Sequence, residues 1–187
     1  MLTVQRARAI VASPQQLWDV LGDPHHLPRW WPRVSRVEAV GLTDTGEPEV
    51  FTEVLMGSSG KVVRADFDVL AAESHRRIVW SQRVENTPFA RVLRSSETEI
   101  TLTGPPAVRA SAELAEEIAG EELGMFGSEG THVSIELRQE LQGFSPKGGS
   151  WIHGISRFGS PLVRRAAAST IEEALDGLER IVGGART

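Results

Sequence analysis

The sequence of 187 residues contains neither cysteine nor tyrosine. Without cysteine, the protein has no disulfide bond, no thiol nucleophile and no cysteine-ligated metal, and a reducing compartment is favoured. Without tyrosine, no phenol can act as the proton donor in any mechanism. The two absences remove thiol and phenol chemistry from consideration.

Long apolar runs and an excess of positive charge are also missing. Nowhere do about 18 apolar residues follow one another, so we expect no segment that spans a bilayer and no integral membrane association. Residues 1–8 contain two arginines with no long apolar run behind them, so we expect no signal peptide and a cytoplasmic location. The net charge of −5 and the isoelectric point of ≈ 5.6 argue against nucleic acid as a partner. Length and an ordinary composition predict a single domain over residues 1–187.

Motifs for covalent, phosphate or metal chemistry are missing as well. The patterns Gly-x-Ser-x-Gly and Gly-x-Gly-x-x-Gly do not occur, and Gly60-Lys61 precedes Val62 where a phosphate-binding loop requires a hydroxyl. The five histidines include no pair with the helical spacing that zinc sites use. We therefore expect neither a metal nor a cofactor.

The densest local signals lie in residues 13–32. Ser13-Pro14 and Asp23-Pro24 each place a capping side chain before proline at the first helical position, which is typical of a helix start. Gly22 is expected to end the first helix after about two turns. Pro28 shortens the second, because proline cannot donate to the carbonyl four residues back. The stretch predicts two short helices.

Alternation of apolar and polar residues predicts seven strands, joined mostly by short turns. In the clearest case Val63, Ala65 and Phe67 share one face, while Arg64 and Asp66 lie on the other. Short turns imply that consecutive strands are antiparallel. The seven ranges are 3–12, 34–42, 49–56, 63–71, 77–84, 90–103 and 131–142.

Residues 104–130 form a long connection between the last two of these strands. The segment opens with Pro105-Pro106, is rich in alanine and glutamate, and ends in several glycines. Connections of this length are usually functional or mobile. We expect an insertion in the sheet that is either a lid or a surface loop.

The C-terminal residues carry an amphipathic helical pattern. Ser160-Pro161 predicts its start and Gly183-Gly184 its end. The sheet is the available apolar partner, and a strongly twisted sheet can wrap around such a helix. Small stripe residues, among them Ala167 and Ala174, are expected to leave a cavity between helix and sheet. The predicted fold is α+β: a seven-stranded curved antiparallel sheet around a long C-terminal helix, with two short helices after the first strand.

Particular residues of this pattern resemble a known family. Leu17-Trp18, Asp23, Leu27 and the run Trp30-Trp31-Pro32-Arg33-Val34, taken with the element order, resemble the START-related helix-grip (SRPBCC) superfamily. The most similar branch is the one named for polyketide cyclases, dehydrases and lipid transport. The resemblance implies a helix-grip fold with a deep pocket for a hydrophobic small molecule such as a lipid, polyketide or isoprenoid. It also implies that catalytic members act mainly by shaping a reactive substrate, with a few polar side chains directing proton transfer.

Three charged residues are candidates for the polar part of the pocket. Arg94 shares the parity of apolar residues in its strand, so it points into the cavity unless a bulge turns it to solvent. Arg164 falls on the apolar stripe of the last helix and either lines the pocket or extends to water. Glu53 lies between two apolar residues of the same parity, and serves as an acid or base if it is buried rather than solvated.

Large aromatic side chains are candidates for the pocket walls, because such walls are mostly apolar and aromatic. Each is equally suited to ordinary core packing. The candidates are Trp30, Trp31, Phe51, Phe67, Trp80 and Phe158.

Three functions remain open. The first is the binding or carrying of a hydrophobic small molecule, which the absence of a catalytic dyad or triad favours. The second is a cyclase or dehydratase acting on a polyketide-like substrate, with Arg94 or Glu53 directing proton transfer. The third is a protein–protein interaction module, since one fold hosts many functions. Convergent polar side chains deep in an apolar cavity would favour the enzyme, whereas a filled interior would favour the interaction module.

Overall fold

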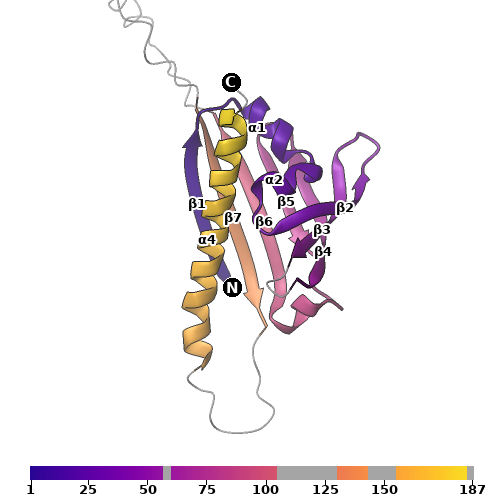
Figure 1. The fold of residues 1–187 in the computed structure, drawn as a ribbon, viewed down its shortest axis with the longest axis vertical. Helices are drawn as coiled ribbons and strands as arrows, with labels where there is room; N and C mark the ends of the chain where they lie inside the picture. Colours follow the sequence, from indigo (N-terminus) through magenta and orange to yellow (C-terminus); the bar gives the residue numbers. More distant parts are fainter. Residues whose placement is uncertain (57–59, 105–129, 143–154, 185–187) are drawn as a thin grey trace, which may run out of the picture.

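The computed structural model describes residues 1–56, 60–104, 130–142 and 155–184, with the side chains of the last segment described from Pro161 onward. A curved sheet and a long helix dominate the fold, and short helices lie at one end of the sheet (Figure 1). The elements are β1 (Leu2–Ile10), α1 (Pro14–Leu21), the 3₁₀ helix η1 (Pro24–His26), α2 (Leu27–Trp30), β2 (Val34–Leu42), β3 (Pro48–Met56), β4 (Val62–Glu73), β5 (Arg77–Gln82), the 3₁₀ helix η2 (Pro88–Arg91), β6 (Leu93–Thr103), β7 (Thr131–Leu141) and α4 (Ile155–Gly184).

The strands of the described residues form one seven-stranded antiparallel sheet in the order β1-β7-β6-β5-β4-β3-β2. From β2 to β7 each strand pairs with its neighbour in sequence, which confirms the predicted meander. β1 pairs with β7 at the other edge, from Leu2 opposite Gln139 to Ile10 opposite Thr131. Together with α4, this sheet is the predicted α+β helix-grip arrangement.

Both predicted helix starts after β1 are confirmed. Ser13 caps α1 through a capping box: its Oγ accepts from the Gln16 N–H at 3.2 Å, and its own N–H donates to Gln16 Oε1 at 3.0 Å. Asp23 caps η1, its Oδ1 accepting from the His25 N–H at 2.9 Å. Pro28 lies in the first turn of α2, so the chain forms η1 and then a one-turn helix instead of one continuous helix.

The long helix α4 packs on the β1–β7 side of the sheet (Figure 1). Its predicted apolar stripe is confirmed, because Ile171, Leu175 and Leu178 are fully buried. Ion pairs add to this contact, since the Arg8 guanidinium of β1 reaches Glu172 at 3.2 Å and Glu179 at 3.1 Å on α4. Apolar burial and paired charges therefore hold the helix against the edge of the sheet.

Two predictions concern the start of the last helix and the insertion between the last two strands. The predicted helix start at Ser160-Pro161 is wrong, because α4 begins at Ile155 and contains Pro161. In the sequence, a capping residue followed by proline looks the same whether a helix starts there or continues through the proline. A helix that continues loses one backbone hydrogen bond at the proline. Most of the expected insertion, residues 105–129, lies outside the described residues.

The longest described helix, α4, carries charged side chains along its exposed face. None of the helices in the described part of the chain is both long and apolar enough to cross a bilayer.

α4 approaches α2 closely at Gly177. A Cβ placed there would lie 2.6 Å from the carbonyl oxygen of Trp30 and 2.7 Å from its Cα. Real side chains do not tolerate such an overlap with backbone atoms, so this position requires glycine. The glycine sets the distance between α4 and the segment that carries Trp30 and Trp31.

We expect Gly177→Ala to lower the free energy of unfolding by about 1–3 kcal/mol, because the added methyl group forces α4 and α2 apart. In an unobstructed helix interior the same change is stabilising by about 1 kcal/mol. A loss of stability, where a gain is usual, therefore itself indicates the close contact between α4 and α2. Urea denaturation followed by circular dichroism measures the change.

Gly183→Ala is the matched control in α4, because a Cβ added at this position meets no atom within 4 Å outside the adjacent backbone of its own helix. It should leave stability unchanged or slightly raised. Equal effects of the two substitutions would contradict the close contact.

Candidate functional site

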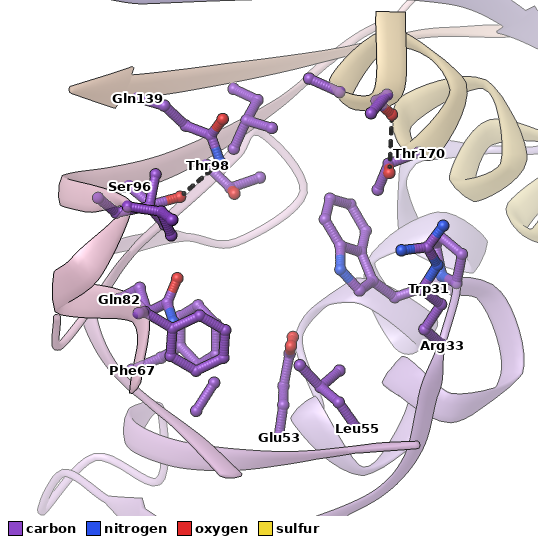
Figure 2. A pocket seen from close by; sticks show the side chains of 18 of the residues that line it. Trp31, Arg33, Glu53, Leu55, Phe67, Gln82, Ser96, Thr98, Gln139 and Thr170 are labelled. Atoms are coloured by element: carbon purple, nitrogen blue, oxygen red, sulfur yellow. Dashed lines mark hydrogen bonds between the residues drawn. The ribbon is translucent and has the colours of Figure 1, made fainter. Parts of the chain in front are cut away.

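The described residues line an open cavity of about 950 Å³ between the concave face of the sheet and α4 (Figure 2). Strands β3 to β7 form its walls, and Val163, Ala167 and Thr170 face it from α4. Ala167 is one of the small residues on the apolar stripe of the helix that the sequence predicts to leave such a space. The volume lies in the range of pockets that hold small molecules.

Trp31, Phe67 and Trp80 line this cavity. The rings of Trp31 and Trp80 meet edge to face with centroids 5.9 Å apart. Phe51 is buried and stacks on Phe67 at 5.0 Å without lining the cavity. Trp30 is likewise buried in the core, and its ring meets that of Trp31 edge to face with centroids 5.4 Å apart. The aromatic candidates therefore divide into a wall and a supporting layer.

Glu53 is the one buried ionisable side chain among the described residues that line the cavity. It lies on β3 between its cross-strand partners Val37 of β2 and Ala65 of β4, and its side chain extends toward the centre of the cavity (Figure 2). Only 3% of the residue is exposed, and Oε1 has no hydrogen-bond partner among the described residues. Burial raises the pKa of the Glu53 carboxyl to about 8, so the group is mostly protonated at neutral pH.

Several neutral polar side chains also face the cavity, and sequence reasoning did not single them out. Gln139 Nε2 donates to Ser96 Oγ at 3.3 Å, and Thr170 Oγ1 donates to the backbone carbonyl four residues earlier at 3.0 Å. Gln82 and Thr98 complete the set (Figure 2). Ser96 and Thr98 were identifiable in principle, because they continue the inward parity of the apolar end of β6.

Arg94 lies outside the cavity, on the exposed surface. Its Nε donates to Gln142 Oε1 at 3.2 Å, and its Nη1 is 3.3 Å from Glu140 Oε1. The physical reason is an irregular register between Leu93 and Ser95, which breaks the simple alternation assumed for this strand. The bulged alternative, in which Arg94 faces solvent, therefore describes its position.

The positions of the remaining candidates follow from the described residues. Arg164 is exposed and does not line the cavity, because its Nη2 donates to the Thr3 carbonyl at 3.3 Å. The Phe158 side chain lies outside the described residues. Arg33, which the sequence analysis did not propose, lines the cavity with an exposed side chain on a left-handed backbone, φ 68°.

The site combines one buried weak acid and neutral hydrogen-bonding groups around an apolar space, and the exposed Arg33 also lines it. A neutral Glu53 carboxyl donates a hydrogen bond or a proton, whereas its ionised form accepts one. Within the described ranges, no group of three or more His, Asp and Glu side chains is placed to hold a metal ion. The arrangement therefore suits the binding of an apolar molecule by one polar end, or proton transfer to it.

Comparison with known sequences gives one family. Residues 1–183 match the family model described as polyketide cyclase / dehydrase and lipid transport. No curated protein sequence matches the chain.

Solved structures share the fold. A START superfamily protein from Mycobacterium smegmatis has a TM-score of 0.64 at 15% identity, over 97% of each chain. A protein from Thermus thermophilus has a TM-score of 0.63 at 19% identity, over 100% of both chains. The di-domain ARO/CYC StfQ from the steffimycin biosynthetic pathway has a TM-score of 0.67 at 10% identity, over 97% of this chain and 51% of that one. At such identities the likeness concerns the fold.

Substitution of Glu53 should change how stability depends on pH. The folded protein retains the Glu53 proton up to about pH 8, whereas the usual glutamate value is 4.5, so the carboxyl lowers folded-state stability as the pH rises through that interval. Glutamine does not titrate. The stability of Glu53→Gln relative to the unsubstituted protein should therefore increase over this interval, by up to about 1.4 kcal/mol per pH unit.

Urea denaturation at a series of pH values measures this difference. Glu49→Gln, an exposed glutamate of the same strand, is the matched control and should track the unsubstituted protein at every pH. A flat difference for Glu53→Gln would show that the folded protein does not bury an unpartnered carboxyl.

Proposed function

This chain belongs to the polyketide cyclase / dehydrase and lipid transport family, and we propose that it binds or carries a hydrophobic small molecule between the sheet and α4. A lipid, a polyketide or an isoprenoid-like compound fits this description. The ligand is expected to lie against the aromatic wall and to turn its polar part toward the neutral polar side chains.

The observation that supports this proposal is the apolar cavity of about 950 Å³. Burial of apolar surface contributes about 25 cal/mol per Å², so a ligand that buries about 300 Å² gains on the order of 7 kcal/mol before the entropic cost of binding. The described side chains leave this space open, which favours ligand binding over an interaction module with a filled interior.

A second candidate function is a cyclase or dehydratase, favoured by the position of Glu53. A neutral carboxyl inside an apolar cavity is a suitable general acid near neutral pH. The relative StfQ is named as an ARO/CYC protein, which is consistent with this chemistry on the same fold. Incubating the protein with an added polyketide-like ketone separates the two functions, since a dehydratase lowers its mass by one water, a cyclase yields an isomer of the same mass with a different retention time, and a carrier returns it unchanged.

Narrowing the cavity should weaken ligand retention. In Ala167→Trp the indole ring projects from α4 into the space that a ligand needs. Native mass spectrometry of the freshly purified protein should detect an apolar ligand on the unsubstituted chain, and occupancy should fall at least about tenfold in the variant because the volumes overlap.

Ser169→Trp places the same ring on the exposed face of α4 and should retain the ligand. Circular dichroism confirms that both variants are folded. Undiminished occupancy in Ala167→Trp would remove this cavity as the binding site.

A further inference from the structure

Among the described residues, Glu53 is the single buried acid of the cavity, and its missing hydrogen-bond partner constrains which ligand groups can lie beside it. Glu53 Oε1 is buried and makes no hydrogen bond to any part of the chain that the structure describes. The facing positions on β4 and β5 are Ala65, Phe67, Trp80 and Gln82, which do not ionise. The residues described on η2, β6, β7 and α4 that line the cavity are also neutral.

The other charged groups near β3 do not neutralise Glu53. Arg33 is the other ionisable lining residue in the described ranges, and its side chain is exposed. On β2, Arg36 is paired with Glu38 at 2.7 Å. On β4, Arg64 is also paired with Glu38, at 3.1 Å. No cation therefore faces the Glu53 carboxyl from the described elements packed against it.

A ligand group placed beside this carboxyl must supply the hydrogen-bond partner that the described residues do not provide. A carboxylate or phosphate would bring a negative charge to an apolar site without a buried cation, which is costly. An ammonium group would require both partners to become desolvated ions, and the Coulombic gain often fails to offset that cost. A neutral oxygen acceptor pairs with the protonated carboxyl without creating any buried charge.

We propose that the protonated Glu53 carboxyl donates a hydrogen bond to a neutral oxygen acceptor of the ligand, such as a ketone or ester carbonyl. The site therefore selects neutral carbonyl-bearing apolar molecules and rejects molecules that place a carboxylate or phosphate deep in the cavity. This inference rests on the proposed ligand-binding function and adds the chemical class of the polar group.

Three matched fluorescent dyes test the inference. All carry the dimethylaminonaphthalene ring system: prodan bears a propanoyl ketone, its deoxygenated parent bears a propyl chain of the same length without the carbonyl, and the third dye bears a carboxylate in place of the ketone. At about pH 6 prodan should bind about three- to tenfold more tightly than the parent, which is the worth of one neutral hydrogen bond. The carboxylate dye should bind more weakly than the parent.

The pH dependence and two variants identify the donor. At about pH 9.5 the preference for prodan over the parent should disappear, because ionised Glu53 no longer donates. Glu53→Gln should retain the preference at both pH values, since its amide N–H donates throughout. Glu53→Met should bind both dyes equally at both pH values, and Glu49→Gln should behave as the unsubstituted protein.

The outcomes separate the two proposals. If prodan and its parent bind with equal affinity at about pH 6, the hydrogen-bond assignment is overturned while the cavity remains a binding site. Tighter binding of the carboxylate dye would also overturn it. If none of the dyes binds, both the ligand-binding function and this inference fail.

Discussion

The long helix α4 rests mainly on the β1–β7 side of the sheet, and the site depends on this one-sided contact. The buried stripe and the Arg8 ion pairs hold α4 there, while Gly177 allows α2 to come against it. Strands β2 to β5 lie to the side of the helix (Figure 1). Small residues such as Ala167 face the gap, so the described residues leave an open pocket beside the packed core.

A carboxyl at position 53 reduces stability where an apolar side chain would increase it. Methionine has a similar length and would carry no desolvation cost at this site. Natural proteins concentrate such unfavourable groups at functional sites, because binding or chemistry requires them. The position of Glu53 at the cavity, with an unpaired oxygen, fits that general pattern better than it fits a structural role.

The sequence predicted the fold well because its signals are local and periodic. The capped helix starts, the alternation along β4 and the stripe of α4 each reflect a single repeating geometry. The site was harder, because parity does not survive the irregular register near Arg94. Helical spacing could not tell Trp31 in the wall from Trp30 in the supporting layer. Nor could alternation decide whether Glu53 is solvated, since that depends on the depth of a cavity formed by distant segments.

The edge-to-face pair of Trp31 and Trp80 gives the protein an intrinsic optical reporter. Both indoles border the cavity, and the absence of tyrosine leaves tryptophan as the principal emitter. A guest that displaces water from the half-buried Trp31 ring lowers the polarity around it, which moves indole emission to shorter wavelength. Occupancy of the interior can thus be followed in the unlabelled protein, even for guests that do not absorb light.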